Sequence, residues 1–196
     1  VMTTLLLSSV PGLFLVLAVF LQVGFGLTPL QSGLTTMPFS VGVLTASLVA
    51  NRLGGRFMRQ RIIIGAGLLF SAMFGLRMVV AGVGDAIVSW HFIAPLFAAG
   101  LGLGTTIPAI FQTVLSNVEG RDAGSASGSL QSFQQAGGAL GVAVMGQIFF
   151  GHFGGQAAGS SDVEFIEALR SALIYSLVAF AMVAAGGAVI RSPGSR

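Results

Sequence analysis

The chain has 196 residues, of which 54% are hydrophobic and only 8% are charged, and its formal net charge is +3. A soluble domain usually carries about 25% charged residues, so much of the surface of this chain must face lipid rather than water. The lack of a basic stripe with stacking aromatics argues against a nucleic-acid binder, and the absence of cysteine excludes disulfides, thiolate zinc sites and a cysteine nucleophile.

Six stretches long and apolar enough to cross a bilayer follow one another along the chain. A spanning helix needs about 20 mostly apolar residues, and none of the six has an acidic residue in its middle. Glycine and proline inside them are tolerated better than in soluble helices. The sequence therefore predicts an all-α membrane protein, one six-transmembrane-helix bundle over residues 1–196, with spans at about 5–25, 33–50, 61–82, 90–115, 124–150 and 168–190.

The chain opens on Val1 directly ahead of an apolar span, and no basic region of the kind that starts a secretory signal precedes it. We expect that an N-terminal portion of the protein is missing. Gln22 in the first span and Gln112 in the fourth are candidates for buried polar residues, because an amide that faces lipid without a partner is costly.

The turn after the second span gathers four of the nine arginines of the chain, namely Arg52, Arg56, Arg59 and Arg61. Short arginine-rich loops stay in the cytoplasm, which predicts a multi-pass protein of the cell membrane with both ends of this segment cytoplasmic. The cluster either only fixes this topology or also contacts a neighbouring element. The paired Gly54 and Gly55 favour the second interpretation, because they let two span ends approach closely and leave guanidinium groups free to contact a neighbouring element.

The third and fourth spans each hold one unusual feature. Arg77 is the only charge well inside a span, and we expect its stem to reach the headgroups of the outer leaflet rather than a pore. Gly100, Gly102 and Gly104 imitate a dinucleotide-binding fingerprint, but they lie inside an apolar span with no strand before them. Helix packing is the better interpretation.

The fifth span concentrates glycine and amide side chains on one helical stripe with 4-3-4-3 spacing, formed by Gly124, Gly128, Gln131, Gln135 and Gly138. Small residues allow close helix contact, and glutamines form hydrogen bonds across such a contact. The stripe is either a static packing face or a sliding interface against another bundle, with Gln131, Gln134 or Gln135 exposed to a cavity. If Gly137 faces the looser side of its own bundle, we expect it to tolerate a leucine better than Gly138 does.

The chain has few side chains that could act in catalysis. Six acidic residues, two histidines and no cysteine or lysine leave few general bases, so the chain is not expected to be an enzyme or to hold a cofactor. His91 and His152 both fall near outer span ends, but no carboxylate stands beside either, so no metal site is expected. Ser161 and Glu164 have capping-box spacing, which predicts a short helix leading into the sixth span.

The stretch LTPLQSGLTTMPFSVGVLTASLVANRLGGRFMRQRIIIGAG resembles the C-terminal half of major facilitator superfamily transporters, in particular the fourteen-span drug:proton antiporter branch of the EmrB/QacA type. The residues that carry the resemblance are Phe20-Leu21-Gln22, Ser32-Gly33, Pro38 and the turn Asn51 to Arg56. The runs LGLGTTIPAIFQTVL and QQAGGALGVAVMG continue it in order and spacing. The resemblance covers essentially the whole chain.

The resemblance implies one bundle of a two-bundle transporter that works by alternating access. The first and fourth helices would face the central cavity, the second and fifth would contact the other bundle, and the third and sixth would face outward. The cavity candidates are then Gln22, Gln112, Gln131 and Gln135. The interbundle packing residues are Gly124, Gly128, Gly137, Gly138 and Gly141, and the cytoplasmic turn is Asn51, Arg52, Gly54, Gly55, Arg56 and Arg59.

Two positions depart from the family pattern. Asn51 takes an acidic position of the turn, and Gln134 stands where relatives often have arginine. No intramembrane carboxylate occurs in this half, so coupling to protons would depend on the other half.

The resemblance implies proton-coupled efflux of amphipathic drugs or small metabolites. The expected partners are the lipid bilayer, a missing N-terminal portion of six or eight spans and a small-molecule substrate, with no nucleic acid. The alternative is a non-transporting membrane scaffold that assembles through its glycine faces, or a self-assembling half-transporter.

Overall fold

The computed structural model describes residues 2–53, 57–82, 89–116, 118–153 and 161–189, and these form six long helices with no strand among them. The predicted all-α six-helix bundle is confirmed. The long helices are α1 (Met2–Val19), α2 (Pro29–Leu53), α3 (Met58–Ala81), α4 (Ile93–Leu115), α5 (Ala123–Phe150) and α6 (Asp162–Val189). Shorter segments adjoin them: the π-helical η1 (Phe20–Gly24) and the 3₁₀ turns η2 (Ser89–Phe92), η3 (Gly120–Asp122) and η4 (Gly151–Phe153).

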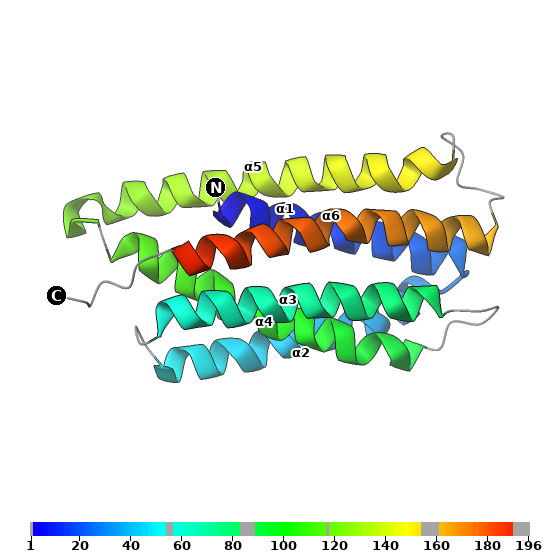
Figure 1. Ribbon diagram of the computed structural model, residues 1–196, viewed down its shortest axis with the longest axis horizontal. Coiled ribbons are helices and arrows are strands. Elements are labelled where there is room, and N and C mark those ends of the chain that lie inside the picture. Colours follow the sequence, from blue (N-terminus) through cyan, green and yellow to red (C-terminus); the bar gives the residue numbers. More distant parts are fainter. Residues whose placement is uncertain (1, 54–56, 83–88, 117, 154–160, 190–196) are drawn as a thin grey trace.

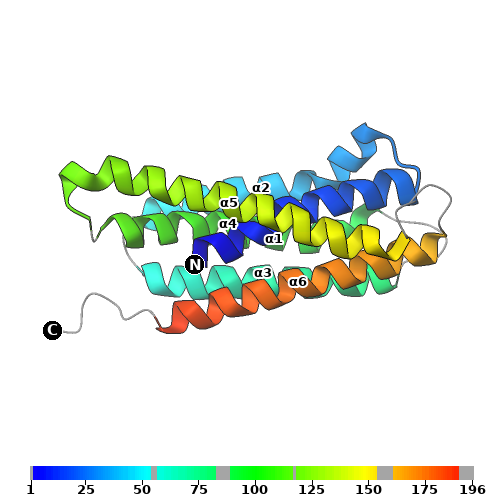
Figure 2. The same ribbon diagram turned by 90° about the horizontal axis from the view of Figure 1, so that it is seen from above.

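Each long helix, with the short segment that adjoins it, is long and apolar enough to cross a bilayer. The helices run back and forth along one direction, so the chain alternates between the two ends of the bundle (Figure 1). Helix α4 packs between α2 and α3, and α1 packs against α5 and α6. The contact between α3 and α6 joins these two groups, and Figure 2 shows α3 and α6 together along one side.

Glycines on two sides of α4 bring its neighbours close. A Cβ added at Gly100 would collide with the backbone of Phe39 in α2, and one at Gly102 would lie 2.7 Å from the carbonyl oxygen of Gly65 in α3. Membrane helices associate through such close packing because lipid supplies no hydrophobic drive between them. The glycine run that imitates a dinucleotide fingerprint therefore packs α4 against both neighbours.

The helices enclose one apolar core. Its largest fully buried side chains are aromatic: Phe20 in η1, Phe92 in η2, Phe149 in α5, and Phe165 and Phe180 in α6. Phe149 and Phe165 gather with a third ring, Phe153, near the start of α6, where the centroids of Phe149 and Phe165 are 6.3 Å apart and those of Phe153 and Phe165 are 4.7 Å apart.

Helix α6 begins with a reciprocal cap. The Ser161 N–H donates to Oε2 of Glu164 at 2.9 Å, and the Glu164 N–H donates to Oγ of Ser161 at 3.4 Å. The capping box thus forms as the spacing indicates. The predicted short helix that leads into the sixth span is the first part of α6, which runs without a break from Asp162 to Val189.

Candidate functional site

One face of α5 is open and polar, although the helix is apolar enough to cross a membrane. Cβ atoms added at Gly124 and Gly128 would meet nothing within 4 Å. Gln131 and Gln135 follow on the same stripe, and both are exposed. We call these four residues the α5 polar face. It points away from the other helices of this bundle.

The hydroxyl and amide groups along this side of α5 differ in whether they have a hydrogen-bond partner. The Ser132 hydroxyl donates to the carbonyl of Gly128 in its own helix at 3.0 Å. In the part of the chain that the structure describes, neither the Gln131 nor the Gln135 amide has a hydrogen-bond partner. An unpaired amide costs about 1–3 kcal/mol in an apolar environment. Hydrocarbon is therefore a poor neighbour for this face, whereas a second polar protein surface or water suits it.

Gly137 and Gly141, expected at the interbundle face, lie instead inside this bundle. A Cβ added at Gly137 would lie 2.7 Å from the carbonyl oxygen of Thr4, and one at Gly141 would collide with the backbone of Ser8. Both neighbours belong to α1. This placement corrects the sequence-based assignment: the two glycines let α1 and α5 pack closely within the bundle.

Gly138 has more room than its neighbour Gly137. The nearest atom to a Cβ at Gly138 is Cγ of Pro11, at an ordinary contact distance of 3.5 Å. Gly137 therefore does not face a looser side of the bundle, so the condition for the expected order of tolerance to leucine is not met. Successive residues of a helix point about 100° apart, and α1 lies on the Gly137 side.

The cavity candidates Gln22 and Gln112 lie at opposite ends of the bundle, because α1 and α4 end on opposite sides (Figure 1). Gln22 lies in the π-helical segment η1, and its Nε2 donates to Oγ of Ser32 at 3.5 Å. Gln112 is half-buried in α4, and its Oε1 is a buried acceptor with no partner among the described residues. The structure does not gather the four candidate glutamines into one site.

The structure describes the residues on either side of the arginine-rich turn but not its centre. Asn51 and Arg52 are exposed at the end of α2, and Arg59 is exposed at the start of α3. Gly54, Gly55 and Arg56 lie outside the described residues. The next residue, Phe57, has a left-handed φ of 58°, which costs a non-glycine residue about 1–2 kcal/mol.

Arg61 differs from the other arginines of this turn. It lies one helical turn into α3 and its exposed fraction is 4%. The sequence groups it with its neighbours, and only the structure separates it from them.

Neither histidine joins a cluster of metal-ligating side chains among the described residues. The His91 ring stacks on Trp90, with centroids 4.7 Å apart. The His152 ring lies between two helices, because its Nδ1 is 2.9 Å from the Ile148 carbonyl oxygen and its Nε2 is 3.3 Å from Oγ of Ser171.

Two polar contacts between distant helices could not be predicted from the sequence. The hydroxyl of Tyr175 in α6 donates to Oγ of Ser8 in α1 at 2.9 Å. Nη1 of Arg77 in α3 donates to the backbone carbonyl of Arg170 in α6 at 2.8 Å. Arg77 is half-buried and contacts α6 through this bond, and its reach to the headgroups stays a prediction. The only sequence signal for either contact is the rarity of such a side chain inside a span.

No protein-family model matches the chain. The chain is 36% identical over 159 residues to a probable actinorhodin transporter of Streptomyces coelicolor, and the alignment covers 79% of this chain and 27% of that protein. It is 31% identical over 141 residues to the puromycin resistance protein pur8 of Streptomyces alboniger, covering 71% and 28%. It is 30% identical over 157 residues to the tetracenomycin C resistance and export protein of Streptomyces glaucescens, covering 78% and 28%. The aligned part thus makes up 27% to 28% of the length of these relatives.

Proposed function

Because the chain belongs to the drug-efflux proteins of the major facilitator superfamily, we propose that it forms one six-helix bundle of an exporter of amphipathic drugs or small metabolites. The chain is a multi-pass membrane protein, and its described residues form six helices fit to span a bilayer. Export would proceed by alternating access, in which two bundles rock against each other around a central site. The proton gradient would drive the cycle.

The α5 polar face carries the proposal. Its open glycines leave room for the backbone of another helix, and its two glutamines lack partners in the described part of this chain. A second bundle of the same transporter would cover this face with backbone and polar side chains. The relatives have the length for such a bundle, because the aligned region is less than a third of each. Since no acidic residue lies in the middle of these spans, the proton-coupling carboxylate would belong to that second bundle.

The glutamines suit a substrate that is apolar over most of its surface with a few polar groups. An amide offers both a donor and an acceptor without a fixed charge. Gln131 and Gln135 would meet the substrate or the other bundle in different states. The Gln112 Oε1, which is buried without a partner among the described residues, would accept from a substrate N–H in a state of the cycle that uncovers it. This assignment makes the chain a transporter rather than an enzyme.

We also propose that both ends of this segment and the arginine-rich turn face the cytoplasm. The chain has no cysteine, so Phe57→Cys introduces a single labelling site into it. In intact cells a membrane-impermeant maleimide should leave this site unlabelled and should label it after permeabilisation. Labelling in intact cells would reverse the orientation.

Transport is tested with the intact protein in proteoliposomes under an imposed proton gradient. Puromycin, tetracycline and ethidium serve as probes. We expect at least one probe to cross against its own gradient, and a protonophore to abolish that movement. If purified, correctly inserted protein moves none of the three in either direction of the gradient, the proposed function is contradicted.

A second copy of this chain is the other surface that could cover the α5 polar face, as a half-transporter or scaffold would require. Gln135→Cys separates the two, because the residue is exposed on that face. In an exporter with two bundles in one polypeptide, oxidation should not link two copies. Efficient disulfide-linked dimers in the membrane would favour self-assembly.

A further inference from the structure

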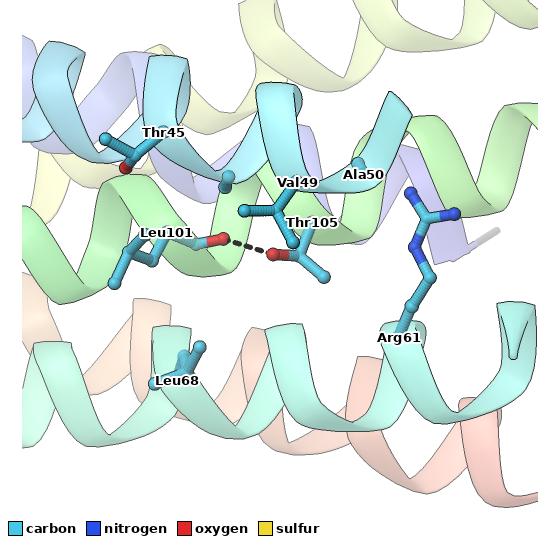
Figure 3. A pocket seen from close by; sticks show the side chains of 8 residues that line it. Thr45, Val49, Ala50, Arg61, Leu68, Leu101 and Thr105 are labelled. Carbon is cyan, nitrogen blue, oxygen red and sulfur yellow. Dashed lines mark hydrogen bonds between the residues drawn. The ribbon is translucent and has the colours of Figure 1, made fainter. Parts of the chain in front are cut away.

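A groove of about 190 Å³ runs between α2 and α3, and α4 forms its floor (Figure 3). Its lining comes from all three helices: Thr45, Ala46, Val49, Ala50, Arg61, Leu68, Leu101 and Thr105. Arg61 extends from α3 toward Ala50 near the end of α2 (Figure 3). The groove does not include any of the glutamines assigned to transport.

The groove is charged at one end and apolar along the rest. Arg61 is its only charged lining residue. The two threonines present little polarity, because the Thr45 hydroxyl donates to the Val41 carbonyl at 3.0 Å and the Thr105 hydroxyl to the Leu101 carbonyl at 2.7 Å. Both hydroxyl protons are thus used within their own helices, so the remaining surface of the groove is largely methyl and methylene groups.

The groove follows the direction that lipid chains take. Leu68 lies seven residues after Arg61 on α3, which places the two ends of the groove about 10 Å apart along the helix axis. Arg61 lies one turn from the start of a span that begins at Met58. The charged end is therefore near the membrane surface, and the apolar end points toward the bilayer centre.

The mouth of the groove is flanked by apolar surface that no other described helix of this bundle covers. Its flanks are apolar and exposed: Leu48 by 58%, Val49 by 57% and Ile64 by 59%. The α5 polar face carries unpaired amides. The mouth of the groove instead carries apolar side chains, which hydrocarbon can cover without a cost in free energy. Bilayer lipid is the partner that such a surface meets.

We propose that this groove binds one phospholipid with an anionic headgroup, of the phosphatidylglycerol type. The phosphate accepts a charge-assisted hydrogen bond from the Arg61 guanidinium, which is almost fully buried and also contacts the protein. One acyl chain lies along the groove toward Leu68 and Leu101. Arg52 and Arg59, exposed at the ends of α2 and α3, add positive potential at the headgroup. A free phosphate ion would leave the apolar length of the groove empty, which favours the lipid.

The proposal depends on α2 and α3 spanning the membrane and on the second bundle leaving this side of α2 uncovered, and its test measures bound lipid, so it stands or fails separately from the proposed transport. The intact protein is purified in a zwitterionic detergent and titrated with phosphatidylglycerol or phosphatidylcholine, and bound lipid is counted by native mass spectrometry. We expect one phosphatidylglycerol to bind at least about tenfold more tightly than phosphatidylcholine, as the loss of a charge-assisted hydrogen bond implies. Arg61→Gln should abolish this preference, Arg61→Lys should keep part of it, and Arg59→Gln on the same helix should keep nearly all of it.

If Arg61→Gln fails to fold, two variants that differ in whether they block the groove test lipid binding instead. Val49 lines the groove and is exposed, so Val49→Trp should block the acyl chain and lose the tight lipid. Leu48→Trp is the matched control, because Leu48 is equally exposed but is not among the lining residues. Equal binding of the two lipids by the native protein, retention of the tight lipid in Val49→Trp, or displacement of it by millimolar inorganic phosphate would each overturn the proposal.

Discussion

The backbone carbonyl of Ser8 in α1 occupies the space that a side chain at Gly141 in α5 would need. The two residues are 133 positions apart in the sequence, and their contact sets the distance between the two helices. The same approach is visible from the other side, where a Cβ at Gly12 would lie 2.7 Å from the carbonyl oxygen of Gly141. This glycine contact is therefore part of the fold of the bundle and not of its outer surface.

Gly141→Ala should destabilise the bundle, because the colliding atoms belong to the backbone and cannot rotate away. Overpacking of this kind costs about 1–3 kcal/mol. The thermal unfolding temperature in detergent micelles measures it. Gly146→Ala on the same helix is the control, because a Cβ there would meet nothing within 4 Å. Equal unfolding temperatures for the two variants would show that α1 and α5 are farther apart than described.

Tyr175 and Ser8 should be coupled in stability. The Tyr175 hydroxyl donates to Ser8, whose own hydroxyl donates to the Leu5 carbonyl at 2.8 Å. Hydrogen bonds between membrane helices average about 0.6 kcal/mol. A double-mutant cycle of Tyr175→Phe and Ser8→Ala, measured by unfolding free energy, should give a coupling of about this size. Strict additivity of the two single changes would mean that the bond contributes nothing.

Arg77→Gln should lower stability while leaving export of the folded protein intact. The change removes the bond from a charged donor to the Arg170 carbonyl, and such a bond contributes about 1.5–3 kcal/mol. Arg77→Lys, which keeps a charged donor, should recover part of the loss. Unfolding temperature and export of the same preparations are compared. Native stability with abolished export would assign Arg77 to the transport pathway instead.

The six-helix class can be read from the sequence, because the length and apolarity of a span are local properties that no distant contact changes. The same holds for the capping box at Ser161 and Glu164, whose partners are three residues apart. The glycine run of α4 is also interpretable, since an apolar span leaves close packing as the main use for it. These features depend on neighbours in the sequence.

Which side of α5 faces which neighbouring helix depends on residues far along the chain, so it could not be predicted from the local sequence. Its glycines occupy two faces: Gly124 and Gly128 are open, whereas Gly137 and Gly141 contact α1. A stripe of small residues indicates a contact but does not say with which helix. The bond of Arg77 to a carbonyl 93 residues away has the same character, because any backbone carbonyl can accept it and no side chain marks the partner.

The central claim is that the α5 polar face moves against a second bundle during export, and a matched pair of glycine substitutions tests it most directly. A Cβ at Gly128 in α5 or at Gly67 in α3 would meet nothing within 4 Å of this chain, so leucine at either position should leave the bundle folded. Both variants are made in the intact protein, and export of ethidium is measured at equal amounts of inserted protein. We expect Gly128→Leu to lose most export, because an added side chain of that size disturbs a close interface by about 1–3 kcal/mol, a cost comparable to the difference between two alternating states. Gly67→Leu, which faces lipid in this account, should export normally. Full export by Gly128→Leu, or equal loss in both variants, would contradict the claim.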